Sequence, residues 1–201
     1  MTNKNLRVLK TKRKLLDALI ELKQAEHKKI TISKLIQHAH ITRETFYLHY
    51  HDCDDFLHAI NIQIVDTLFE ACMIEDDDQQ RYFSFKEALI HIQNDHLVYQ
   101  TLLADQRDDC LYQCLEDRFK QEIVKHLRAN DSVGLEHLLV NIKVTLMTGA
   151  IMNVIHEWLS AGMIYNGAYL AKVIENGLDQ LVAQVGDDSW QTFYKGKTLT
   201  N

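Results

Sequence analysis

The stretch TISKLIQHAHITRETFYLHYHDCDDFL, residues 31–57, decides the fold of this chain. It opens with Thr31, a residue type that commonly caps helices, and continues with apolar residues at the spacing of one helical face: Ile32, Leu35, Ile36 and Ala39. A second short helix is predicted to begin at Thr42, another capping residue, and to carry Phe46 and Tyr50 on one face. The pattern therefore predicts two short helices joined by a three-residue turn, which are the dimensions of a helix-turn-helix.

The outward side of the second short helix is the part of this motif that can meet a ligand. Leu35 and Ile36 are predicted to pack under that helix and to brace it. Its outward side chains are then polar or amphipathic: Thr42, Arg43, Thr45, Tyr47 and His49. Because the major groove of DNA is about wide enough for one helix, this arrangement favours the reading of a duplex.

The charge of the chain changes sign at the motif. Residues 1–43 hold eleven Lys and Arg against three acids, a net charge of +8, whereas residues 44–201 hold eleven against twenty-five, a net charge of −14. Opposed charge in two regions of one chain indicates a polyanion-binding end attached to a body of a different kind. A solvated basic first helix would give the same charge, so charge alone leaves both explanations open.

Outside the motif the sequence predicts helices throughout. Proline is absent and glycine occurs seven times, and both depletions favour long uninterrupted helices. Apolar residues recur at helical spacing over six further segments, at about 7–27, 52–73, 85–103, 108–128, 133–162 and 166–185. No segment alternates as a strand does, and residues 75–80 are polar and non-periodic, as in a linker. The expected fold class is all-α.

Two runs of residues resemble a known family. The run TFYLHYHDCDDFL, residues 45–57, is similar to the signature that closes the helix-turn-helix of TetR/AcrR regulators and opens their fourth helix. The apolar spacing of residues 7–30 also fits the first helix of that family. The run EWLSAGM, residues 157–163, resembles the end of the penultimate helix in the subgroup that includes the dihydroxyacetone-kinase operon activators. The resemblance implies a transcription regulator that binds a near-palindromic operator on double-stranded DNA as a homodimer and responds to a small-molecule effector.

The resemblance also implies how the chain is divided. We expect a three-helix helix-turn-helix DNA-binding domain over residues 1–52 and a connecting helix over residues 53–74. A helical domain for ligand binding and dimerisation would follow over residues 81–201.

Carried onto this sequence, the family's DNA contacts fall on both short helices. Arg43 and Tyr47 lie at positions that approach base edges, and Ser33 lies at a groove-facing position of the first short helix. Thr45 and His49, together with Tyr47, lie at phosphate-contacting positions. The complete set of predicted DNA-binding residues is Thr31, Ser33, Thr42, Arg43, Thr45, Tyr47 and His49.

Two residues depart from the family pattern. His40 stands in the turn where glycine is usual, because the backbone there tends to positive φ, which histidine tolerates at some strain. Cys53 stands where the family commonly has a lysine that reaches a phosphate. One cation fewer should weaken DNA binding and flatten its dependence on salt.

In the family, the C-terminal helices enclose an effector pocket, and the last two pair with their copies in a dimer. Polar, aromatic or flexible residues on otherwise apolar faces are the pocket candidates here, although each also fits a core position: His96, Tyr99, Met147, Asn153 and Trp158. The last predicted helix carries an apolar stripe for the dimer, which a monomer could also bury on itself: Leu170, Val173, Ile174, Gly177, Leu178 and Leu181.

Other classes of function lack their motifs in this sequence. There is no nucleophile elbow, zinc-protease motif, phosphate-binding loop or Cys and His pair at a catalytic spacing, so we expect no catalytic residues and no enzyme. The alternative function is a degenerate helix-turn-helix protein that acts as a co-regulator through protein contacts, without tight DNA binding. No apolar run is long enough to span a membrane and no signal peptide is evident, so we expect a cytoplasmic protein.

We expect no cofactor and no metal. The four cysteines, at 53, 72, 110 and 114, are predicted to be free thiols. Cys110 and Cys114 are one helical turn apart and could hold a metal, but no further ligand pattern completes such a site. His49 and His51 are two residues apart, a spacing that does not put both rings on one helical face.

Overall fold

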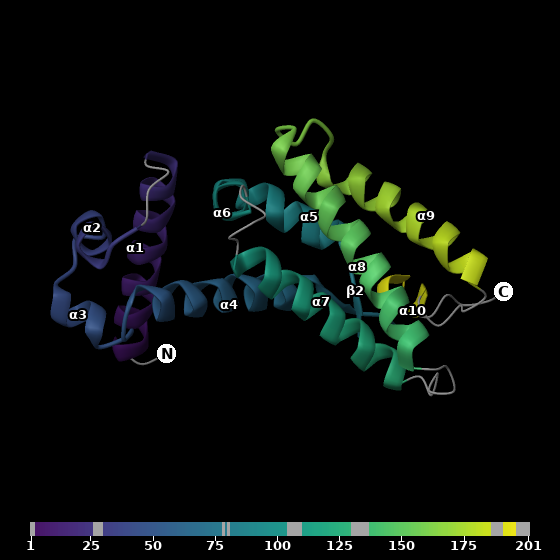
Figure 1. Cartoon of the computed structure of the whole chain (residues 1–201), viewed down its shortest axis with the longest axis horizontal. Coiled ribbons are helices and arrows are strands. Elements are labelled where there is room, and N and C mark those ends of the chain that lie inside the picture. The colour runs from purple at the N-terminus through teal and green to yellow at the C-terminus, as the bar shows by residue number, and fades with distance from the viewer. Residues whose placement is uncertain are drawn as a thin grey trace. The chain divides into compact units, whose positions relative to one another are not determined.

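The computed structural model describes residues 3–25, 30–77, 79, 81–103, 110–129, 137–185 and 191–195. Within these residues the chain is helical apart from one two-stranded sheet, so the predicted all-α fold is confirmed (Figure 1). The chain divides into two compact units, Met1–Gln63 and Ile64–Asn201, which we describe separately. The predicted helix ends at His27 and Asp108 and the predicted loop at 130–132 lie outside the described residues.

The first unit holds the predicted helix-turn-helix. Helix α1 (Asn3–Ala25) packs on α2 (Ile32–His38), and α2 packs on α3 (Arg43–Tyr47). Thr31 caps α2, because its hydroxyl accepts from the Lys34 amide at 3.4 Å. Thr42 caps α3 in the same way, with the Thr45 amide at 3.2 Å. Both capping predictions are confirmed, and each cap satisfies a backbone donor that the first helical turn leaves unpaired.

The turn between α2 and α3 ends in a Schellman motif. The His40 amide donates to the Gln37 carbonyl at 3.3 Å, and the Ile41 amide donates to the Ile36 carbonyl at 3.1 Å. This motif requires a left-handed residue between the two helices, and His40 has φ 51°. The positive φ predicted at His40 is therefore confirmed, and histidine occupies a conformation that glycine usually takes.

An aromatic cluster fixes α3 to the start of α4 (Cys53–Cys72), the helix that runs across the division between the units. The rings of Phe46 and Tyr50 are 5.5 Å apart, and those of Tyr50 and Phe56 are 5.1 Å apart. All three residues are buried, as predicted for Phe46 and Tyr50. Edge-on and tilted aromatic pairs add to the burial of apolar area, so the cluster sets the direction of α3.

A β-hairpin takes the place of the predicted linker at residues 75–80. Strand β1 (Met73–Glu75) pairs antiparallel with β2 (Arg81–Phe83), with Met73 opposite Phe83. Among the described residues of its loop, Gln79 has a positive φ of 62°. The strands are three residues long each, too short for alternation to be recognised in the sequence.

Six further helices of the second unit are described: α5 (Phe85–Asn94), α6 (His96–Leu102), α7 (Cys110–Ala129), α8 (His137–Ser160), α9 (Gly167–Val185) and α10 (Gln191–Lys195). Helix α5 packs on α9, and α7 packs on α8 (Figure 1). The continuous pattern predicted over 85–103 is broken at Asp95, whose φ of −104° and ψ of 31° are not helical. Helix α10 was not predicted; it packs on β2 and α9. None of the described helices has the length and apolar character needed to cross a membrane.

Two glycines shape the connection from α8 to α9. Gly162, with φ 75°, ends α8 in a second Schellman motif, in which the Met163 amide donates to the Trp158 carbonyl at 2.8 Å. Gly167 lies against α5 so closely that a Cβ there would stand 2.9 Å from the Leu89 carbonyl carbon and oxygen. The Gly167 amide donates to the Gln93 side chain at 3.1 Å, which holds the start of α9 on α5.

Candidate nucleic-acid interface

Helix α3 has one buried face and one face open to solvent. Phe46 is completely buried, whereas Thr42, Arg43 and Glu44 are exposed. Tyr47 packs edge-on against the Phe46 ring at 5.5 Å and still leaves 49% of its surface exposed. The outward face is therefore a rigid, mostly polar surface of the size that a groove can admit.

Hydrogen bonds hold two pairs of the predicted contact residues together. The Arg43 guanidinium donates to the Ser33 hydroxyl at 3.1 Å, which joins α3 to α2. The Thr42 and Thr45 hydroxyls are 3.0 Å apart. Ser33 and Arg43 are both exposed, so their bond lies on the surface and leaves the remaining donors of Arg43 open to solvent.

The remaining predicted contact residues are Thr31, Tyr47 and His49, and no hydrogen bond described in the structure joins them to these two pairs. Thr31 is exposed, and its hydroxyl is engaged as the cap of α2. His49 follows the end of α3 and is half-buried, with its ring 6.2 Å from the ring of Tyr50. The structure thus places all seven predicted residues in the first unit, and it joins two pairs of them directly: Ser33 with Arg43, and Thr42 with Thr45.

Two residues of the outward face were missed in the sequence. Leu48, directly after α3, is an apolar side chain with 80% of its surface exposed. Glu44 is an exposed carboxylate whose pKa is lowered, first by a backbone hydrogen bond and then by the Thr42 hydroxyl. Glu44 and Leu48 stand four residues apart, on the face that Arg43 and Tyr47 also occupy, so helical spacing could have found both.

The start of α4 carries carboxylates where the resemblance implies a phosphate contact. The Asp52 carboxylate accepts from the Asp55 amide, and the Asp55 carboxylate accepts from the His51 amide, both at 2.8 Å. The Cys53 thiol donates to the Ile30 carbonyl at 3.8 Å. The partial positive charge of this helix end is therefore already balanced by acids, which opposes a further anion at this place.

Exposed cations lie instead on α1. Where the side chains of α1 are described, the exposed basic residues are Arg7, Lys10, Arg13 and Lys14. Arg13 is engaged with Asp17 at 3.2 Å on the same helix, in a surface pair that solvent screens and that contributes little to stability. The excess positive charge of residues 1–43 is thus carried largely on the surface of α1.

The five predicted pocket residues differ in how far they are buried. Tyr99, Met147 and Trp158 are buried, and the Trp158 indole donates to the Tyr165 carbonyl at 2.7 Å. Burial raises the pKa of Tyr99. Asn153 is exposed and donates to the Gly149 carbonyl at 2.9 Å, whereas His96 is half-buried at the start of α6.

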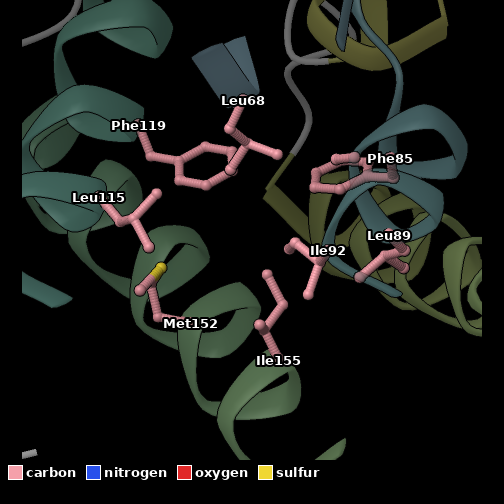
Figure 2. A pocket seen from close by; sticks show the side chains of 9 residues that line it. Leu68, Phe85, Leu89, Ile92, Leu115, Phe119, Met152 and Ile155 are labelled. Atoms are coloured by element: carbon pink, nitrogen blue, oxygen red, sulfur yellow. The ribbon is translucent and has the colours of Figure 1, made fainter. Parts of the chain in front are cut away.

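A small cavity of the second unit lies elsewhere, between α5, α7 and α8 (Figure 2). Nine apolar residues line it: Leu68, Phe85, Ala88, Leu89, Ile92, Leu115, Phe119, Met152 and Ile155. Its volume of about 10 Å³ has room for about one water molecule, and its lining offers that water no polar partner. None of the five predicted pocket residues belongs to this lining.

The apolar stripe predicted on α9 is divided between two surroundings. Leu170, Ile174 and Leu178 are buried within the chain, whereas Val173 is 47% exposed and Gly177 is exposed. The side chain of Leu181 lies outside the described residues. The periodicity of the sequence indicates an apolar face of α9 but does not say which surface covers it. In the structure, most of the described residues of this face pack inside the second unit.

Exposed apolar side chains nevertheless remain on each of the last two long helices. On α8, Leu146 is 67% exposed and Ile142 is also exposed. On α9, Tyr169 and Val173 are exposed, four residues apart on one helical face. Helices α8 and α9 pack side by side (Figure 1). Tyr169 and Val173 form the outward row of α9, a surface that a second chain can cover.

These features define an all-α chain whose N-terminal unit is a helix-turn-helix with a solvent-facing second helix. No known protein family matches the chain, and no curated protein sequence matches it. Among solved structures, the chain is similar to one described as the dihydroxyacetone kinase operon activator DhaS. The TM-score is 0.57 at 18% identity, with 88% of this chain and 96% of that chain covered. At this identity the likeness shows that the two proteins share a fold.

Proposed function

We propose that this chain is a DNA-binding transcription regulator of the TetR/AcrR type, which binds a near-palindromic operator as a homodimer in the cytoplasm. The single observation that carries the proposal is the outward face of α3, where Ser33 holds the Arg43 guanidinium above a braced, polar helix. The fold shared with a protein described as an operon activator agrees with this proposal. The proposed division keeps residues 1–52 for DNA, 53–74 as a connecting helix and 81–201 for regulation and dimerisation.

In the proposed complex, α3 enters the major groove and its side chains divide into two roles. Arg43 donates two hydrogen bonds to a guanine edge, and Tyr47 lies against a neighbouring base. Thr31, Thr42, Thr45 and His49 contact phosphates and fix the register of the helix without reading sequence. The cations of α1 add attraction that does not depend on sequence and that weakens as salt is added.

The test of this role is the Arg43→Ala variant of the full chain. Operator sites are first selected from random duplexes by the wild-type chain, and affinity is then measured by fluorescence anisotropy. We expect Arg43→Ala to lose about 1–3 kcal/mol of specific binding and to relax the base preference at one position in each half-site. Arg81→Ala is the matched control, because it removes an exposed arginine from the second unit. Unchanged affinity and unchanged base preference in Arg43→Ala would refute the assignment.

The proposed dimer is tested at Val173. Val173→Asp places a charge in the outward row of α9 at a residue that a single chain leaves 47% exposed, so the fold of one chain should tolerate it. Gln121→Asp on α7 is the control, since residue 121 is also exposed. We expect sedimentation to find dimers for the wild type and the control and monomers for Val173→Asp, because a buried unpaired charge is strongly unfavourable. A monomeric wild type, or a dimeric Val173→Asp, would reject this interface.

The alternative proposal is a co-regulator that acts through protein contacts without tight DNA binding. The acids at the start of α4 favour this alternative, because they stand where similar regulators approach a phosphate. Non-specific duplex DNA titrated with salt separates the two proposals. A DNA-binding regulator shows an affinity that falls linearly with the logarithm of salt concentration, whereas the co-regulator shows no slope.

A small-molecule effector remains part of the main proposal, with His96, Tyr99, Met147, Asn153 and Trp158 as candidate contacts. The small apolar cavity of the second unit would have to widen before it could hold more than water.

A further inference from the structure

The two cysteines at the start of α7 place their sulfur atoms side by side. Cys110 and Cys114 are one helical turn apart, so both side chains leave the same face of the helix. Their Sγ atoms are 4.0 Å apart. Both residues are free thiols and both are half-buried, whereas the adjacent Leu111 and Leu115 are buried in the core. The pair therefore lies at the edge of the core, close enough to the surface for an ion to reach it.

The distance between the two sulfurs matches that in a metal bis-thiolate. A zinc–thiolate bond is about 2.3 Å long, so two sulfurs on one ion of that size are at most about 4.6 Å apart. A separation of 4.0 Å then corresponds to a sulfur–metal–sulfur angle of roughly 120°. Both sulfurs can bind one ion at this angle without movement of the helix backbone.

We propose that Cys110 and Cys114 form a binding site for a soft, thiophilic metal ion of the Cu(I) type. Thiolate ligands select Cu(I) and zinc among the biological metals. A structural zinc ion takes four ligands, of which this pair would supply half. Cu(I) is a softer ion that needs fewer ligands, and an angle of roughly 120° is that of a three-coordinate Cu(I) ion held by the two thiolates and one exogenous ligand. The site lies in the second unit and does not depend on the proposed binding of DNA.

Binding of the ion replaces the two thiol protons, which are released to solvent as the two metal–sulfur bonds form. A metal ion displaces each thiol proton directly as its bond to sulfur forms.

The experiment uses the full chain, reduced and free of oxygen, and Cu(I) in competition with a coloured Cu(I) chelator. We expect the wild type to withhold one Cu(I) per chain and to gain near-ultraviolet absorption from thiolate-to-metal charge transfer. Cys110→Ser/Cys114→Ser should lose both signals, and each single variant should bind Cu(I) at least about tenfold more weakly. Cys53→Ser is the matched control and should keep both signals, because it removes a half-buried thiol far along the chain.

Three results would overturn the proposal. The first is a wild type that withholds no Cu(I), the second is a double variant that binds Cu(I) as tightly as the wild type, and the third is loss of binding in Cys53→Ser as well. Circular dichroism checks that each variant is folded, and Cys110→Ala/Cys114→Ala repeats the test without a hydroxyl at either position. If the wild type instead loses two thiols in air and withholds no Cu(I), the pair forms a disulfide and the metal proposal fails.

Discussion

Gly167 tests how the second unit is held together, because α9 begins in contact with the backbone of α5. A Cβ at this residue would lie 2.9 Å from the carbonyl carbon and oxygen of Leu89 and 3.1 Å from the amide nitrogen of Ile90. Real Cβ atoms essentially never approach other atoms to under 3.0 Å, and these are backbone atoms in the middle of a helix. Gly167→Ala must therefore push α9 away from α5 or strain the bond from its amide to Gln93.

The magnitude follows from two opposed effects. Overpacking by one methyl group costs about 1–3 kcal/mol. The gain in helix propensity from glycine to alanine is at most about 1 kcal/mol, and it is smaller at the first residue of a helix. The free energy of unfolding should therefore fall by about 1–2 kcal/mol, which lowers Tm by roughly 2–8 °C in a chain of this length.

Chemical and thermal denaturation followed by circular dichroism measure both quantities. The matched control is Gly177→Ala in the middle of α9, because a Cβ there meets no atom of the described residues outside its own helix turn within 4 Å. This control should keep or slightly raise the stability of a single chain. If Gly167→Ala is as stable as the control, the close approach of α9 to α5 is wrong.

Two further predictions concern buried groups. Tyr50→Phe should leave the chain at least as stable, with a gain on the order of 1 kcal/mol in urea denaturation, because the buried Tyr50 hydroxyl has no hydrogen-bond partner among the described residues. A loss of more than about 1 kcal/mol would indicate a partner for that hydroxyl. The second prediction concerns alkaline pH: burial, with the Glu87 carboxylate as the next cause, raises the pKa of the Cys72 thiol from 9.0 to about 12. Above about pH 9 the thiol ionises in the unfolded chain but stays protonated in the folded chain. The free energy of unfolding should therefore not depend on Cys72 below pH 9, and it should fall as pH rises toward 12. Cys72→Ala should flatten that fall in denaturation curves taken across this range, and equal slopes in both proteins would contradict the raised pKa.

The features that could be predicted from the sequence are those that depend on neighbouring residues. Thr31 and Thr42 cap their helices because a hydroxyl placed before a helix reaches the amide three residues ahead, whatever the rest of the chain does. The left-handed turn at His40 is equally local, since the Schellman motif is formed by the last turn of α2 and the two residues that follow Ala39. The burial of Phe46 and Tyr50 follows from the helical period alone.

The features that were missed depend on distant partners or on single breaks in a regular pattern. The helical spacing of apolar residues continues across Asp95, so it does not predict that α5 ends and α6 begins there. The α9 stripe was correctly recognised as apolar, but only packing shows that Leu170 and Ile174 are buried in their own unit. Leu48 was missed because an exposed leucine has no signal in composition, although its place on the outward face of α3 could have been derived.

The hydrogen bond from Arg43 to Ser33 lowers the conformational entropy that Arg43 can lose when it binds a partner. A free arginine side chain samples many rotamers, and ordering such a side chain at an interface costs about 0.5–1.5 kcal/mol. Here part of that ordering is completed before any partner arrives, since one guanidinium nitrogen is tied to the Ser33 hydroxyl. Five donor hydrogens belong to an arginine, so the tether leaves a fork of donors for a planar acceptor. Ser33 on α2 thus restricts the Arg43 side chain to a conformation in which its other donors face solvent.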